Sequence, residues 1–350
     1  WFDVDVGVRQ GCVISPMLFD VFVDQLAREV KALKLGVEAG AERLAMLLYA
    51  DDIVVLANSV EELQRMMKAV EGFCKRLQLQ VNMSKTKVVE FGARGVGKAK
   101  VYWKGEELEE VEEYKYLGML VEKGGAWKKN KDRMLRKARR AAALAWNMAV
   151  RMGDMSVKGM TSMWNALVRP HLEYGAEVIN SHNDFVWEEA EKLARKIGRR
   201  VLKCGKRLPN DAIMGELGWM TMRGRRMLLR LSYWSKILAM EDGRWVKKVY
   251  EHGRRRLEKN GRANTWCNLT RKWLRDLGLE EEWKQQAVGP AWQERLKEKI
   301  MEYEARNWRR RAMRKDDVKV KDCTASGRPS PSWSGTCNTR TCTSDGCGRS

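Results

Sequence analysis

The strongest constraint on this fold is the stretch LLYADDIVVLA, residues 47–57, in which two adjacent carboxylates interrupt an otherwise apolar run. The run is too short and too sharply interrupted for an amphipathic helix, so it predicts two short strands joined tightly at Ala50–Asp52. Such apolar strands indicate a buried hairpin, where adjacent carboxylates are costly unless something neutralises them. Mg²⁺ prefers hard oxygen ligands, so Asp51 and Asp52 are candidate metal ligands. An ordinary Asp-rich turn is the alternative interpretation.

The residues on either side of this hairpin predict helices and further strands. Ser15 and Pro16 predict an N-cap and first turn for a helix over 16–34. Ser59-x-x-Glu62 predicts a capping box for a second helix with one apolar stripe. The segments LQLQV (77–81), KVVEFG (87–92), KVYWKG (100–105) and YKYLGMLV (114–121) read as strands. This order predicts an α+β fold, a split βαββαβ sheet that lacks its first strand.

The chain changes character after Gly124-Gly125. From about residue 126 to 316 apolar residues recur every three or four positions among many Lys and Arg, which predicts basic helices. We expect the tryptophans in this region to anchor helix packing, with base stacking as the alternative; they are Trp164, Trp187, Trp219, Trp234, Trp273 and Trp308. Residues 321–350 are rich in Ser, Thr, Gly, Pro and Cys and predict a disordered tail.

Charge is distributed unevenly along the 350 residues. Residues 1–92 carry 11 Lys and Arg against 13 Asp and Glu, and residues 93–350 therefore carry 56 against 33. Such a basic excess on helices favours a polyanionic partner, most often nucleic acid, over a merely solvated surface. No run of about 18 apolar residues is present, so we expect no membrane span. The chain starts at Trp1, and we expect it to be cut from a longer protein without a visible secretory signal.

A second candidate site is the loop GVRQGCVISP, residues 7–16. Gly7 and Gly11 permit close backbone approach, and Gln10 supplies both a donor and an acceptor. The loop ends where the predicted helix begins, and a helix N-terminus suits contact with phosphates.

These segments, taken in order, resemble consecutive motifs of a reverse transcriptase. They are GVRQGCVISPMLF, LLYADDIVVLA, LQLQVNMSKTKVVEFG and YKYLGMLV, which cover about residues 1–121. The residues around these motifs are similar to those in the polymerases of non-LTR (LINE-type) retrotransposons. The later segments LVRPHLEYGAEV and GELGWMTMRGRRMLLRLSYWSKI carry a softer likeness to the region after the polymerase.

The resemblance implies a role for each matching residue. Asp51 and Asp52 would hold two Mg²⁺ ions, with Mn²⁺ as a substitute. Tyr49 would lie by the primer end or the incoming nucleotide, while Gln10 and Gly11 would contact template and dNTP. Asn82 and Lys85 match the next motif, in which Lys85 would protonate pyrophosphate or else be a solvated lysine. Tyr116, Leu117 and Gly118 match the primer-grip hairpin. Arg136, Arg139 and Arg140 would contact backbone phosphates in the basic helices.

The resemblance also has departures. The family has a further aspartate on an upstream strand; Asp3 and Asp5 lie too close to the loop to replace it. The fingers and an endonuclease domain have no counterpart either, so we expect this chain alone to be inactive as a polymerase. In the tail, Cys323, Cys337, Cys342 and Cys347 lack the usual zinc-ligand spacing. The single cysteines elsewhere suit reduced thiols in an intracellular protein.

The sequence thus predicts a partial palm followed by a helical thumb and a helical C-terminal domain. The expected domains are a partial palm (1–92), a primer-grip hairpin and connection (93–123), a thumb (124–205), a basic helical region (206–320) and the tail (321–350). The expected partners are an RNA template, a DNA primer or target and dNTPs, in the nucleus and in cytoplasmic ribonucleoprotein. The alternatives are a group II intron-type maturase and a catalytically dead nucleic-acid-binding remnant. The oligomeric state and the template stay open.

Overall fold

The protein divides into two compact units. A computed structural model describes residues 12–40, 42–92, 100–153, 155–180, 185–205, 208–261 and 265–312. Unit 1 comprises Trp1–Asn130 and Ser235–Leu269, and unit 2 comprises Lys131–Trp234 and Thr270–Ser350. A late segment of the chain therefore belongs to the same unit as the N-terminal hairpins.

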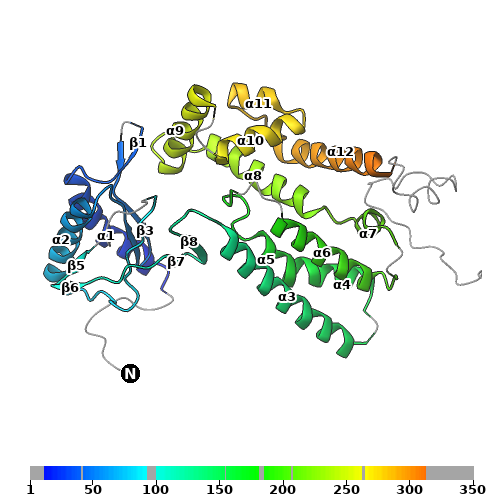
Figure 1. The fold of residues 1–350 in the computed structure, drawn as a ribbon, viewed down its shortest axis with the longest axis horizontal. Helices are drawn as coiled ribbons and strands as arrows, with labels where there is room; N and C mark the ends of the chain where they lie inside the picture. The colour runs from blue at the N-terminus through cyan, green and yellow to red at the C-terminus, as the bar shows by residue number, and fades with distance from the viewer. Residues whose placement is uncertain are drawn as a thin grey trace, which may run out of the picture. The chain divides into compact units, whose positions relative to one another are not determined.

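Unit 1 combines helices with antiparallel hairpins (Figure 1). Its elements are α1 (Ser15–Ala32), β1 (Val37–Ala39), β2 (Glu42–Leu44), β3 (Met46–Tyr49), β4 (Asp52–Val55), α2 (Val60–Arg76), β5 (Tyr102–Trp103), β6 (Glu106–Glu107), β7 (Glu113–Tyr116), β8 (Met119–Glu122) and α9 (Trp245–Asn260). This mixture of helices and small antiparallel sheets confirms the predicted α+β class.

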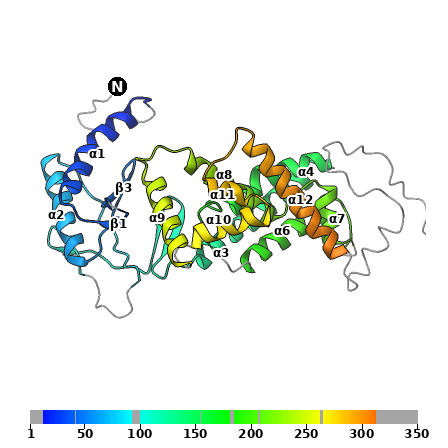
Figure 2. The same ribbon diagram turned by 90° about the horizontal axis from the view of Figure 1, so that it is seen from above.

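The core of unit 1 forms between α1 and α2, which lie side by side in both views (Figure 1, Figure 2). The apolar residues recur at helical spacing and so face the core; among them Leu26 and Val30 of α1 and Met66 and Phe73 of α2 are buried. The Phe73 ring meets Phe22 edge-on at 5.9 Å. Burying a side chain of this size contributes roughly 1.5–3 kcal/mol, so the apolar stripes hold the two helices together.

Both predicted helix starts are present, and one of the two caps differs from the prediction. Ile14, not Ser15, occupies the N-cap position of α1 and makes no side-chain cap bond, so the predicted Ser15 cap is wrong. The second cap is confirmed at Ser59, whose hydroxyl accepts a hydrogen bond from the Glu62 amide at 3.2 Å. The Glu62 carboxylate accepts a hydrogen bond from the Asn58 amide, whereas a capping box would place this bond on the amide of Ser59. Pro16 sits in the first turn as predicted.

Each strand pair among the described residues forms its own two-stranded sheet. The hairpin β3–β4 and the hairpin β7–β8 confirm predicted strands, and β5–β6 confirms part of a third segment. The predicted strands at 77–81 and 87–92 are wrong. Gln78 takes a left-handed φ of 53° just after α2, and Val88 makes only an isolated bridge to Glu110. Their apolar residues still pack on the core, because burial does not require ladder pairing.

Unit 2 is helical throughout its described part. Its elements are most of α3 (Lys128–Arg151), α4 (Val157–Met163), the π-helical segment η1 (Trp164–Val168), α5 (Arg169–Glu173), α6 (Phe185–Val201), α7 (Asn210–Glu216), most of α8 (Met222–Leu238), the later part of α10 (Thr265–Asp276), α11 (Glu280–Gln285) and α12 (Trp292–Ala312). These helices fall where the apolar periodicity predicted helical segments.

Tryptophans anchor unit 2, as the sequence predicts. Trp234 is fully buried and lies 6.1 Å from Trp283 and 5.7 Å from Trp292 between ring centroids. Trp164 stacks on Trp219 at 4.8 Å. Of the six expected anchors Trp308 is only half-buried, and the others are buried; these are Trp164, Trp187, Trp219, Trp234 and Trp273. Rings enclosed in this way are unavailable for base stacking.

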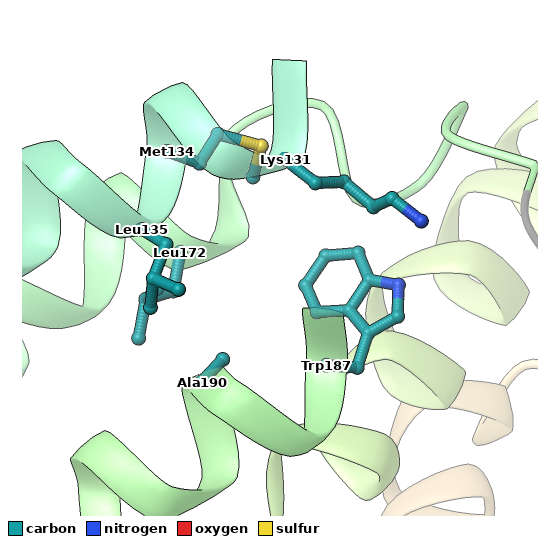
Figure 3. Close-up of a pocket in the computed structure, with 6 residues that line it drawn as sticks. All are labelled: Lys131, Met134, Leu135, Leu172, Trp187 and Ala190. Carbon is teal, nitrogen blue, oxygen red and sulfur yellow. The ribbon is translucent and has the colours of Figure 1, made fainter. Parts of the chain in front are cut away.

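A small cavity in unit 2 has a lining that is apolar except for Lys131 (Figure 3). The lining comes from α3, α5 and α6 and comprises Lys131, Met134, Leu135, Leu172, Trp187 and Ala190. Its volume of about 10 Å³ holds at most one water-sized molecule, so it is no ligand site. None of the described helices is both long and apolar enough to cross a membrane.

Candidate functional site

The carboxylates of Asp51 and Asp52 lie at the exposed tip of the β3–β4 hairpin. Tyr49 pairs with Asp52, so only Ala50 and Asp51 form the turn. Ala50 takes a φ of 50°, the left-handed value that a two-residue hairpin of type II′ requires at this position. The turn is tight, as predicted, and both aspartates lie at the tip of the hairpin.

The hairpin is less buried than its apolar sequence suggests. Both carboxylates are exposed, Tyr49 is 62% exposed, and Leu48 and Ile53 are also exposed. Only the base of the hairpin contacts the core, through Met46 and Val55. The expectation of a buried tip is therefore wrong, and the carboxylates carry no burial cost here. The tip therefore forms an exposed surface that is both apolar and acidic.

The donor chemistry at this tip fits a hard divalent cation. Neither Asp51 nor Asp52 forms an ion pair within the described part of the chain, so four carboxylate oxygens are available. Mg²⁺ is commonly held by one or two carboxylates together with substrate phosphates. No cluster of three or more His, Cys, Asp or Glu suited to a metal occurs among the described residues. The hairpin therefore offers part of a coordination shell.

The β7–β8 hairpin lies within electrostatic reach of the β3–β4 tip. Burial raises the pKa of Tyr116, and the negative charge of Asp52 raises it further. The turn of this hairpin is Leu117 and Gly118, with φ values of 45° and 79°, the pattern of a type I′ turn. Of the predicted primer-grip residues, Tyr116 therefore lies within electrostatic reach of Asp52 in unit 1.

Asn82 and Lys85 share one turn. The Asn82 Oδ1 accepts hydrogen bonds from the Ser84 hydroxyl at 2.7 Å and from the Lys85 amide at 3.2 Å. This occupies the side-chain oxygen of Asn82 within the protein, so its amide NH₂ is what remains for a substrate. The ammonium of Lys85 is exposed and forms no ion pair with a described residue.

Tyr114 joins that turn to the β7–β8 hairpin. Its hydroxyl donates a hydrogen bond to the backbone oxygen of Lys85 at 3.1 Å. Tyr114 and Tyr116 alternate along β7 and so lie on the same face of the strand. The sequence reasoning missed Tyr114; the alternating tyrosines in YKY were the available signal.

Two sets of predicted residues stand apart from this arrangement. Gln10 and Gly11, like Asp3, Asp5 and the cysteines of the tail, lie outside the described residues. Arg136, Arg139 and Arg140 lie exposed on the part of α3 that belongs to unit 2. Arg139 pairs with Glu189 at 3.2 Å, while Arg136 and Arg140 have no ion pair in the described chain.

Comparison with known proteins shows which family the first third of the chain resembles. Residues 2–121 match the family model described as reverse transcriptase (RNA-dependent DNA polymerase). The matched segment, which includes the Tyr-Ala-Asp-Asp hairpin, is therefore similar to reverse transcriptases.

The relatives of the chain narrow the class. The chain is 24% identical over 224 residues to the RNA-directed DNA polymerase from mobile element jockey of Drosophila funebris, covering 59% of this chain and 24% of the relative. It is 29% identical over 135 residues to the Pol polyprotein from type-1 retrotransposable element R2 of Nasonia vitripennis, covering 36% and 13%. The chain thus spans about a quarter or less of these two relatives. They confirm the resemblance to LINE-type, non-LTR reverse transcriptases.

Proposed function

We propose that this chain serves RNA-directed DNA synthesis by a non-LTR retrotransposon. The observation that carries the proposal is the pair of unpaired carboxylates at the tight tip of β3–β4, within the segment that matches reverse transcriptases. The substrates are an RNA template, a DNA primer or nicked target, and dNTPs. The work takes place in the nucleus, after assembly with the RNA in cytoplasmic ribonucleoprotein.

Asp51 and Asp52 hold the metal ions in this proposal. These residues would hold two Mg²⁺ ions, or Mn²⁺ in their place, and the ions would supply activation of the primer 3′-oxygen and stabilisation of the leaving pyrophosphate. The rigid two-residue turn fixes the spacing of the carboxylates before any ligand arrives. The exposed ring of Tyr49 borders the pair and contacts the primer end or the nucleotide base.

The neighbouring turn and hairpin position the substrates. Lys85 presents a free ammonium that donates a proton toward pyrophosphate, and Tyr114 fixes the backbone that carries it. Tyr116, Leu117 and Gly118 place the primer strand beside Asp52. Asn82, Gln10 and Gly11 contact the nucleotide and the template in this proposal.

The basic helices hold the duplex by its phosphates. The free guanidinium groups of Arg136 and Arg140 supply contacts that depend strongly on salt and little on sequence. The partial palm, connection, thumb, basic region and tail predicted from the sequence remain the proposed functional divisions. We expect the chain alone not to extend a primer, because its described hairpin supplies two carboxylates where the family uses three.

The experiment is primer extension by the jockey polymerase of Drosophila funebris in which this chain replaces the matching segment. We expect Mg²⁺-dependent extension on an RNA template. Asp51→Asn should lower it by orders of magnitude and leave RNA binding nearly intact, because only the metal site changes. Asp20→Asn, which alters an exposed carboxylate on α1, is the matched control. A graft that binds RNA but extends equally well after the Asp51→Asn substitution contradicts the proposal.

A further inference from the structure

The helix α9 joins the unit of the Tyr-Ala-Asp-Asp hairpin from a distant part of the sequence. Lys248 forms an ion pair with Glu42 of β2 at 2.6 Å, and Figure 1 shows α9 beside β1. Tyr250 and Leu257 are buried, and the Tyr250 ring meets Trp266 edge-on at 6.0 Å. Helix α9 is therefore held within unit 1.

Exposed cations lie on the side of α9 opposite Tyr250 and Leu257. At about 100° per residue, Arg255, Arg256 and Lys259 fall within an arc of about 100° on that side. We call the exposed cations of this helix and its N-cap the α9 ridge; they are Arg244, Arg255, Arg256 and Lys259. Lys248 is held by Glu42 and is not part of the ridge. Residues 244–259 carry seven Lys and Arg against two Glu, so the ridge keeps a net positive charge.

Nearby acidic residues do not neutralise the ridge. Glu251 pairs with Arg255 at 3.4 Å and Glu258 pairs with Arg254 at 2.5 Å. Asp242, just before the helix, pairs with Lys247 at 2.7 Å. Arg244, Arg256 and Lys259 have no ion-pair partner in the part of the chain that the structure describes. Two guanidinium groups and one ammonium group thus remain available to bind a polyanion.

We propose that the α9 ridge is a nucleic-acid contact of unit 1 and binds the backbone phosphates of the template–primer duplex. The inference rests on the proposed function and adds to it a phosphate-binding element outside the matched segment 2–121. From residue 244 to 259 the helix rises about 22 Å, at about 1.5 Å per residue. Phosphates of one strand follow each other at about 3.4 Å along a duplex. The ridge therefore spans roughly six phosphates, enough for each free cation to find its own.

The attachment of α9 explains why this contact would serve the hairpin. The Glu42–Lys248 pair ties the helix to β2, and β2 is followed directly by β3 of the hairpin. A phosphate contact on α9 is consequently carried by the same compact unit as Asp51 and Asp52. Charge-only contacts position a duplex without reading its sequence, as a polymerase requires.

The test measures binding of a fluorescent RNA–DNA hybrid to the full chain at several KCl concentrations. The variant is Arg244→Ala/Arg256→Ala/Lys259→Ala. We expect the slope of log affinity against log salt to become shallower by about three, one for each lost contact. The matched control is Arg65→Ala/Lys68→Ala/Lys75→Ala, which removes three exposed cations from α2 of the same unit and should leave the slope unchanged. Equal slopes for the two variants overturn the proposal.

Two further measurements make the result decisive. Replacing Arg244 and Arg256 by Lys should keep the wild-type slope, because phosphate contact needs the charge and not the guanidinium shape. A slope as shallow as that of the alanine variant would overturn the proposal. Vesicles of phosphatidylserine and phosphatidylcholine are the second probe. Loss of vesicle binding with unchanged hybrid binding would overturn the proposal in favour of a membrane surface. Neither readout requires catalysis, so failure here is distinct from failure of primer extension in the jockey graft.

Discussion

Ala50→Gly should stabilise the β3–β4 hairpin that carries Asp51. Ala50 holds a φ of 50°, where an L-residue costs about 1–2 kcal/mol because its Cβ crowds the following carbonyl oxygen. Glycine removes this cost, but its unfolded chain is more flexible, and the extra conformational entropy lost on folding costs about 0.5–1 kcal/mol. The net expectation is a stabilisation of about 0.5–1 kcal/mol.

Local hydrogen exchange measures this directly. A gain of about 0.5–1 kcal/mol corresponds to roughly two- to five-fold slower exchange where exchange occurs by opening of the hairpin. The Leu56 amide, which donates to the Ala45 oxygen at 2.8 Å, reports on the base of the hairpin. Ala143→Gly, on the exposed face of α3, is the same substitution in a helix and should speed local exchange by costing about 1 kcal/mol. Equal effects of the two substitutions would refute the turn argument.

Three other perturbations test the packing around the site. Tyr114→Phe removes the hydrogen bond to the Lys85 oxygen, so the Thr86 amide should exchange faster, while Tyr102→Phe should not affect it. Glu42→Gln should increase hydrogen exchange within α9, because it removes the ion pair with Lys248. In the native protein Lys248 lowers the pKa of Glu42. The stabilisation from this pair is therefore fully present above the ordinary glutamate pKa and is lost as the pH falls through the lowered pKa of Glu42. Gly198→Ala should destabilise unit 2 by about 1–3 kcal/mol in urea unfolding, because its Cβ would lie 2.6 Å from Ile213 Cγ2. Gly215→Ala, which meets nothing within 4 Å, should not destabilise it.

The parts of the fold set by local pattern could be predicted from the sequence. The β3–β4 hairpin follows from two apolar strands around a short polar turn, and α2 follows from Ser59 and its apolar stripe. The segment 77–81 has the same apolar character, yet the left-handed Gln78 ends α2 and turns the chain away from a ladder. Apolar residues there are buried without pairing, which periodicity alone cannot distinguish from a strand.

The parts set by long-range contact could not be predicted. The β1–β2 hairpin has charged residues on both strands, such as Glu38 and Arg43, so no apolar alternation marks it. The association of α9 with β2 depends on a pair between Lys248 and Glu42, 206 residues apart. At the site, the sequence indicated Asp51, Asp52 and Tyr116, but their proximity across two hairpins is a tertiary fact. The exposure of the hairpin tip was likewise invisible in an apolar sequence.

The most direct test of the central claim is Mn²⁺ binding at the hairpin tip of this chain, in the presence of a primer–template hybrid and a dNTP. We predict paramagnetic broadening of amide signals from residues 47–57 and from Tyr116, and its loss in Asp51→Asn. Asp20→Asn should leave the broadening unchanged. Broadening that persists in Asp51→Asn, or that centres on another carboxylate, would contradict the assignment of Asp51 and Asp52 as the metal ligands.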